Sequence, residues 1–205
     1  MTNRREFVQG AVALSALPAA AQAASAARPA AAVPQIALHA AVIDERFEAS
    51  RAFGAAMTRR GVAVRPAPAG DVTALWNGAF SATWSQTPQA IAGLTAPPAL
   101  FCLEQLAWMH RMRVVFHAEH IAGRDGALSH AVLRAASLPE NDPERDLLAA
   151  DADWPALVAR MIAGQPAAAG PAGPSVAALE RALDPEATTL VSWIIAPTGA
   201  ASAAV

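Results

Sequence analysis

Apolar residues follow two alternating patterns along the chain, short and nearly continuous runs and longer stretches with a helical repeat. Residues 35–43 form an almost unbroken apolar run, which is typical of a strand buried on both faces. After it, Ala49, Phe53 and Met57 recur every four residues and predict an amphipathic helix over residues 45–60. Gly61 ends this helix, because glycine is favoured just past a helix C-terminus.

The same alternation continues through the first half of the chain. Further strands are predicted over residues 62–66 and 89–95, and further helices over residues 71–80 and 97–111. Strands separated by helices of this length indicate crossover connections, which join parallel strands. The pattern therefore predicts an α/β fold, a three-layer sandwich with a mainly parallel sheet covered by helices on both faces.

Two neighbouring apolar runs predict an antiparallel hairpin at one edge of this sheet. They cover residues 113–121 and 127–133, and the turn signal Gly-Arg-Asp-Gly at residues 123–126 separates them. Beyond the hairpin, residues 154–162 predict a helix and residues 188–196 a last strand.

Local composition divides the chain into four segments. Residues 1–27 are an Ala-rich leader, and residues 35–162 are the α/β core. Residues 163–175 are rich in Pro, Ala and Gly and predict a linker that builds no core of its own. Residues 176–197 are expected to supply a helix and a strand that complete the same domain.

Composition and charge argue against several classes of protein. The chain has 205 residues, of which 54% are apolar and 16% charged, and its formal charge is −2. This balance argues against a nucleic-acid binder with a basic surface. No run of about 20 bulky apolar residues follows the leader, so stable membrane insertion is not expected once the leader is removed. The single Cys excludes an intrachain disulfide.

The leader begins with two adjacent arginines, Arg4 and Arg5, followed after one residue by Phe7 and an aliphatic residue. An apolar stretch of small residues comes next, and residues 21–23 fit an A-x-A cleavage site, with residues 24–26 as the alternative. This order resembles a twin-arginine (Tat) export signal. The resemblance implies a periplasmic protein that crosses the membrane folded, carrying a cofactor, accompanied by a partner, or folding fast. The alternative is a cytoplasmic protein with a disordered Ala-rich tail.

Polar residues follow the three strands that are predicted to be parallel. Asp44, Asp71 and Thr95 each stand where a strand ends and a helix begins. Because ligands bind at the carboxyl ends of parallel strands, these residues are a candidate ligand-binding rim. The alternative is that each of them caps the following helix.

Glu104 is the only charged residue between Asp71 and His110, a stretch that also holds five aromatic residues. A carboxyl group buried and unpaired in such surroundings holds its proton and acts as a general acid. Glu104 is therefore a candidate catalytic acid, as is Asp44. The alternative places Glu104 on the solvent edge of its helix beside Gln105, or in a pair with Arg111.

The predicted hairpin carries a cluster of potential metal ligands. A turn of two or four residues sets Glu119 opposite His130, and alternation along the strand then puts His117 on the same face. Two imidazoles and a carboxylate suit a single transition metal ion such as iron, zinc or manganese. A three-residue turn instead pairs His120 with His130 and breaks the set.

The remaining sequence motifs do not point to a particular activity. Cys102 is a candidate nucleophile, although its position between two bulky apolar residues of a helix favours an inert, buried thiol. The chain has no dinucleotide fingerprint, phosphate loop, nucleophile elbow or haem motif. The leading hypothesis is a periplasmic accessory or binding protein that escorts, or is a small subunit of, an exported oxidoreductase. The alternatives are a small metal-dependent enzyme and a solute-binding domain.

Overall fold

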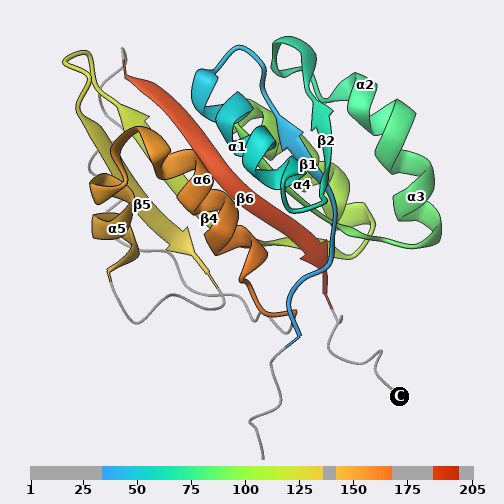
Figure 1. Cartoon of the computed structure of the whole chain (residues 1–205). Helices are drawn as coiled ribbons and strands as arrows, with labels where there is room; N and C mark the ends of the chain where they lie inside the picture. Colours follow the sequence, from blue (N-terminus) through green and yellow to red (C-terminus); the bar gives the residue numbers. More distant parts are fainter. Residues whose placement is uncertain (1–33, 136–141, 168–186, 199–205) are drawn as a thin grey trace, which may run out of the picture. The chain divides into compact units, whose positions relative to one another are not determined.

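The computed structural model describes residues 34–135, 142–167 and 187–198 (Figure 1). Within them the chain has an α/β fold in which helices pack on a six-stranded mixed sheet. The spatial order of the strands is β2-β1-β3-β6-β4-β5. Their bounds are β1 Leu38–Ile43, β2 Ala63–Pro66, β3 Ala90–Thr95, β4 Met112–Ala122, β5 Leu128–Arg134 and β6 Thr188–Pro197.

The expectation of a mainly parallel sheet is wrong. β1 pairs in parallel with β2 and with β3, whereas the β3–β6, β6–β4 and β4–β5 pairs of the described sheet are antiparallel. The last strand, β6, inserts between β3 and β4 and runs antiparallel to both (Figure 1). The apolar run of β6 shows that the strand is buried, but its position follows from long-range pairing that no local pattern encodes.

Three helices lie close to their predicted ranges, whereas the helix predicted over residues 71–80 continues to Gln86. α1 spans Glu48–Thr58 and α4 spans Pro97–Met109, with prolines in its first turn. Between β2 and β3 the chain forms a 3₁₀ turn and then a continuous helical stretch made of α2, a π-helical turn and α3. The bounds are Pro68–Gly70, Thr73–Leu75, Trp76–Phe80 and Ser81–Gln86 in turn. After the hairpin come α5, Pro143–Ala149, and α6, Trp154–Ala163.

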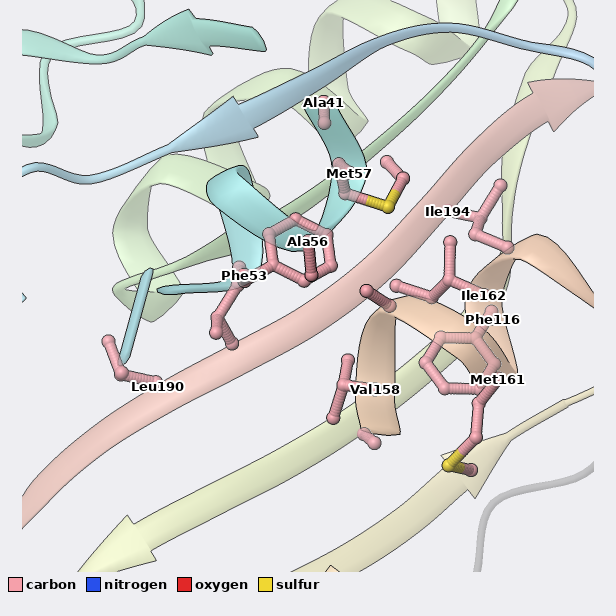
Figure 2. Close-up of a cluster of buried hydrophobic side chains, with 14 of the residues drawn as sticks. Ala41, Phe53, Ala56, Met57, Phe116, Val158, Met161, Ile162, Leu190 and Ile194 are labelled. Atoms are coloured by element: carbon pink, nitrogen blue, oxygen red, sulfur yellow. The ribbon is translucent and has the colours of Figure 1, made fainter. Parts of the chain in front are cut away.

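Alternating side chains of the strands divide the core into two clusters. In β1, Ala41 and Ile43 belong to one cluster, and Ala40 and Val42 belong to the other. The first cluster also contains buried residues of α1, α5 and α6, and the second contains residues of α2, α3 and α4. Figure 2 shows part of the first cluster, where side chains of α1 and α6 meet over β4 and β6. Both faces of the sheet are therefore buried, which explains why β1, β3 and β6 are nearly all apolar.

Several predicted segments lie outside the described residues. These are the leader over residues 1–27, most of the linker over residues 163–175 and the helix predicted within residues 176–183. In the described part of the chain, no helix combines the length and the apolar character needed to cross a membrane.

Candidate functional site

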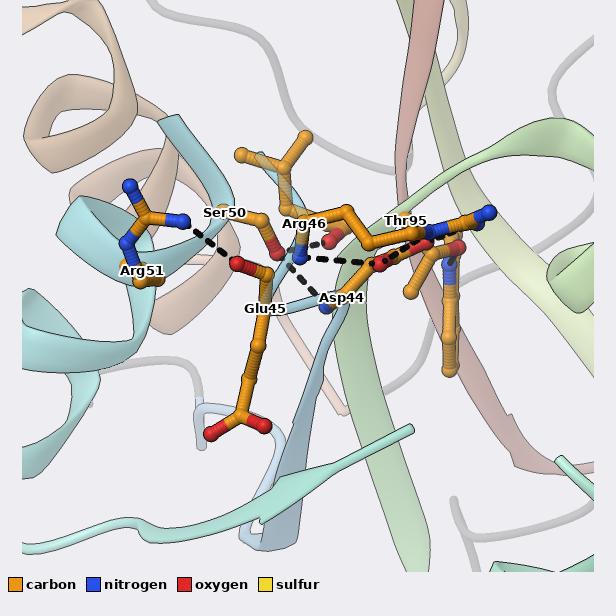
Figure 3. A network of polar contacts seen from close by, with 8 residues as sticks. Asp44, Glu45, Arg46, Ser50, Arg51 and Thr95 are labelled. Atoms are coloured by element: carbon orange, nitrogen blue, oxygen red, sulfur yellow. Dashed lines mark hydrogen bonds and ion pairs between the residues drawn. The ribbon is translucent and has the colours of Figure 1, made fainter. Parts of the chain in front are cut away.

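The carboxyl end of β1 carries an ion pair between a buried carboxylate and the arginine two residues later. The Arg46 guanidinium donates through Nε to Oδ1 of Asp44 at 2.9 Å and through Nη2 to Oδ2 at 2.6 Å (Figure 3). The Asp44 side chain is fully buried, whereas half of the Arg46 side chain is exposed. The hydrogen bond from Arg46 to Asp44 raises the pKa of the guanidinium above its ordinary value. Arg46 is thus a fixed positive charge at the surface, held by a carboxylate underneath.

Ser50 of α1 joins this end of β1 to β3. The backbone N–H of Asp44 donates to the Ser50 hydroxyl at 2.8 Å, and that hydroxyl donates to the carbonyl of Leu94. Thr95 follows directly and accepts a hydrogen bond of 3.1 Å from Nε1 of the buried Trp193. The structure therefore brings Asp44 and Thr95 to the same edge of the sheet, as predicted (Figure 3).

Neither Asp44 nor Thr95 caps a helix. α1 begins at Glu48 after Phe47, and α4 begins at Pro97 after Ala96, in both cases without a side-chain cap. Both polar groups are fully buried and bonded within the protein, so they support the edge and offer no free atom to a ligand.

Asp71 lies on the surface beyond this pair. Its Oδ1 accepts the backbone N–H of Thr73 at 2.7 Å, and hydrogen bonds from Thr73 lower the pKa of the carboxyl group. This is a local turn just before α2, whose N-cap residue is Val72 and which has no side-chain cap. The loop before it passes close to the ion pair, because a Cβ at Gly70 would stand 3.2 Å from Oδ2 of Asp44.

A pocket of about 270 Å³ opens beside Arg46, on the face of the sheet that α1 and α6 cover. Its walls come from the start of α1, the far end of β4, the start of β5, α6 and the start of β6. The lining residues are Arg46, Phe47, Glu48, Ala49, His120, Ala122, Leu128, Trp154, Thr188 and Leu190. The lining residues are mainly apolar, and Arg46 and Glu48 contribute one charged residue of each sign.

A buried hydrogen-bond network forms the wall of the pocket around His120. Nδ1 of His120 lies 2.8 Å from Nδ1 of His130 in β5, and its Nε2 lies 2.8 Å from the hydroxyl of Ser192 in β6. The ring of Trp154 stacks on the His120 ring with centroids 4.4 Å apart. These contacts connect three strands and α6, so the wall is rigid.

The two histidines of this network are neutral at physiological pH. Burial, together with the nearby His130 and His117, lowers the pKa of His120 well below its ordinary value. Burial also lowers the pKa of His130, from 6.5 to about 4. Both nitrogens of His120 are engaged and Ser192 is fully buried, and Nε2 of His130 has no hydrogen-bond partner among the described residues but is buried as well, so the network offers no solvent-accessible base or nucleophile. Its geometry suits binding better than acid–base chemistry.

The predicted metal set of His117, Glu119 and His130 is not brought together. His130 pairs with His120, and Glu119 pairs with Ala131, so the register is one residue away from the predicted one. A three-residue turn sets this register, with Gly123 N–H bonded to the Ala127 carbonyl. By alternation His117 and Glu119 then lie on the opposite face, where partial burial raises the pKa of Glu119. Across the described ranges no three His, Cys, Asp or Glu side chains gather as metal ligands.

The remaining candidates lie on α4 or outside the described residues. Glu104 is partly exposed next to the exposed Gln105, which agrees with the interpretation that it lies on the solvent edge of its helix and not with a buried acid. Cys102 is exposed, which contradicts the expectation of a buried thiol. The signal residues Arg4, Arg5 and Phe7 lie outside the described residues.

Sequence reasoning did not select Arg46, Trp154 and Ser192 as site residues. The only available signal was the three-residue turn, which predicts the pairing of His120 with His130. Ser192 and Trp154 join the site from distant parts of the chain, through the insertion of β6 and the packing of α6.

A larger pocket, of about 570 Å³, lies at the opposite edge of the sheet between the start of β1 and the end of β6. The polar side chains that line it, Gln35, His39 and Gln89, are all exposed. Because none of them is buried or held in a network, we regard the pocket beside Arg46 as the better-built site.

No protein-family model matches this chain, and neither the curated proteins nor the solved structures give a significant match.

Proposed function

We propose that this protein is a periplasmic binding protein that holds a small, partly apolar solute in the pocket beside Arg46. The observation that carries the proposal is the position of this pocket, at the edge where β1, β3 and β4 end and against a charge that Asp44 holds in place. Ligands of α/β proteins bind at this edge of the sheet.

The lining supports a ligand with an apolar body and one polar end. Phe47, Leu128, Trp154 and Leu190 offer apolar contacts, whereas Arg46, Glu48 and Thr188 are the polar residues beside them in the lining. A volume of about 270 Å³ lies just below the usual range for drug-sized ligands, so the solute is small. The buried His120 network supplies a rigid wall, and preorganisation of this kind reduces the cost of binding.

Thermal unfolding with a collection of small organic acids, alcohols and amino acids tests this proposal. A ligand present at about 100 times its Kd should add about 2.7 kcal/mol to the free energy of unfolding. The variant Thr188→Phe places a ring at the mouth and should abolish the shift. Thr87→Phe, at another exposed threonine, after α3, should retain it. The proposal fails if no compound stabilises the protein, or if Thr188→Phe responds like Thr87→Phe.

The proposed localisation rests on Arg4, Arg5 and Phe7 and has its own test. Replacement of both arginines by lysine keeps the charge but removes the twin-arginine pattern. In a bacterial host the native chain should reach the periplasm in processed form, and the double-lysine variant should stay in the cytoplasm. Equal export of both chains, or retention of both, would contradict export by the Tat pathway.

The arrangement of helices supports a finer description of the architecture as well. We propose a three-layer sandwich, with α1, α5 and α6 as one outer layer and α2, α3 and α4 as the other. The division of the core into two clusters supports this description.

A further inference from the structure

The outer face of α4 is an apolar surface on a helix whose other side is fully packed. Phe101 is 63% exposed, Trp108 49% and Met109 70%, and the Cys102 thiol and Gln105 are exposed among them. We call these five residues the α4 face. Ala99, Leu100, Leu103 and Ala107 are buried on the opposite side of the same helix. Large apolar side chains gathered in this way mark an interaction site more often than an ordinary surface.

The charged side chains near the C-terminal end of the α4 face are positive. The Arg113 guanidinium lies 6.0 Å from the Trp108 ring centroid, and the exposed Arg111 follows the helix directly. The first turn of α4 carries no acidic residue, and Glu104 lies at the flank of the face, partly exposed. A complementary surface therefore needs apolar side chains along its centre and a carboxylate near Trp108.

We propose that the α4 face docks an acidic, amphipathic helical segment of another protein. An apolar stripe at helical spacing is the natural complement of a helix face, because ridges of one helix pack into the grooves of another. A carboxylate on that segment would pair with Arg113 at the rim, where charges steer association and set orientation. The docking surface lies on the other face of the sheet from the pocket beside Arg46 and does not depend on it.

The same charges argue against a second copy of this chain. In an antiparallel pair of α4 helices, Arg113 would approach the first turn of the partner, which offers no acid. In a parallel pair, two Arg113 side chains would face each other.

Alkylation of Cys102 gives a direct test, because Cys102 is the only thiol in the chain and lies within the α4 face. Two synthetic helical peptides of about 18 residues, five turns, would share one Leu/Phe face and carry either Glu or Arg at the flanking positions. With the full chain, the Glu peptide should slow the reaction of Cys102 with N-ethylmaleimide by about ten-fold or more, and the Arg peptide by less than about two-fold.

Charge variants make the result specific. Arg113→Glu should remove or reverse the preference for the Glu peptide, and Arg59→Glu, an exposed arginine on the opposite side of the sheet, should keep it. If Arg113→Glu does not fold, Gln105→Glu and Gln105→Lys test the same point, since they should weaken and strengthen binding of the Glu peptide respectively.

Three results would overturn the proposal. The first is that neither peptide protects Cys102 at about 1 mM, the weakest affinity of interest. The second is protection that grows with protein concentration in the absence of peptide, which would assign the face to a second copy. The third is protection by vesicles of anionic phospholipid and not by the Glu peptide, which would assign it to a membrane surface.

Discussion

Substitution of Gly93 by Ala tests the tight packing at the centre of the sheet. Gly93 in β3 is buried opposite Trp193 in β6, and an added Cβ would stand 2.5 Å from Cε2 and 2.9 Å from Cη2 of the indole, with Cζ2 closer still. Ordinary contacts lie at 3.4–4 Å, so the ring must retreat by about 1 Å in a close-packed interior. The indole is fully buried and donates to Thr95, so it cannot retreat freely.

The expected cost of Gly93→Ala follows from two contributions. Overpacking of a core costs about 1–3 kcal/mol. Loss of the indole hydrogen bond, with its N–H left buried, costs about 1 kcal/mol or more. We expect a loss of about 3 kcal/mol in the free energy of unfolding, which corresponds to a fall of about 6–12 °C in Tm for a chain of this size.

Denaturant and thermal unfolding measure this loss, with Gly78→Ala as the matched control. Gly78 is exposed within the helical stretch before α3, and a Cβ there meets nothing within 4 Å, so Ala should be neutral or slightly stabilising. A second substitution, Trp193→Leu, should relieve the clash, so the double variant should lose less than the sum of the single ones. The reasoning is refuted if Gly93→Ala falls within about 1 kcal/mol of Gly78→Ala, or if the two core substitutions add.

Three further predictions concern the site and α4. The pKa of His130 falls from 6.5 to about 4 on folding, so the unfolded chain binds more protons between these values, and stability should fall as pH drops from 6.5 towards 4. The loss in the free energy of unfolding from this residue is about 3 kcal/mol at most, and about 2 kcal/mol once solvent screening is included. Unfolding measured at each pH should show that stability depends less steeply on pH in His130→Gln than in the native protein. The exposed His39→Gln should keep the native dependence. Arg46→Ala leaves the buried Asp44 carboxylate without its ion-pair partner, whereas Asp44→Asn leaves a guanidinium that still reaches water. The fall in Tm should therefore be about twice as large for Arg46→Ala, and equal falls in Tm would contradict this account. The exposed Cys102 should react fully with a thiol reagent under native conditions, and a reaction that needs denaturant would contradict the described surface of α4.

Local pattern was sufficient for most of the secondary structure. The continuous apolar runs located β1, β3, β4 and β6, because both faces of these strands are buried or nearly so. The spacing of Ala49, Phe53 and Met57 located α1, because Phe53 and Met57 pack on the sheet while the opposite side of the helix faces water. The Gly-Arg-Asp-Gly signal located the hairpin, because Gly126 adopts a positive φ of 79° that glycine tolerates without strain.

The residues of the candidate site lie far apart in the sequence, beyond the few residues over which a local pattern is informative. Asp44 and Thr95 were expected at one edge, since crossover connections bring parallel strand ends together. Their burial was not expected, because it depends on Arg46, Ser50 and Trp193, which approach from a turn, a helix and a distant strand.

The sequence by itself determined the α/β alternation, the hairpin and the approximate ends of the described strands and helices, because these follow from periodicity and turn chemistry within a few residues. Only the tertiary structure decided that β6 separates β3 from β4 and that the hairpin pairs His120 with His130. A slip of one residue moves every side chain of a strand to the other face, and the energy difference that selects the register lies in long-range packing. With this register His120 and His130 form a buried pair beside the pocket at Arg46, and the predicted metal set of His117, Glu119 and His130 is not assembled.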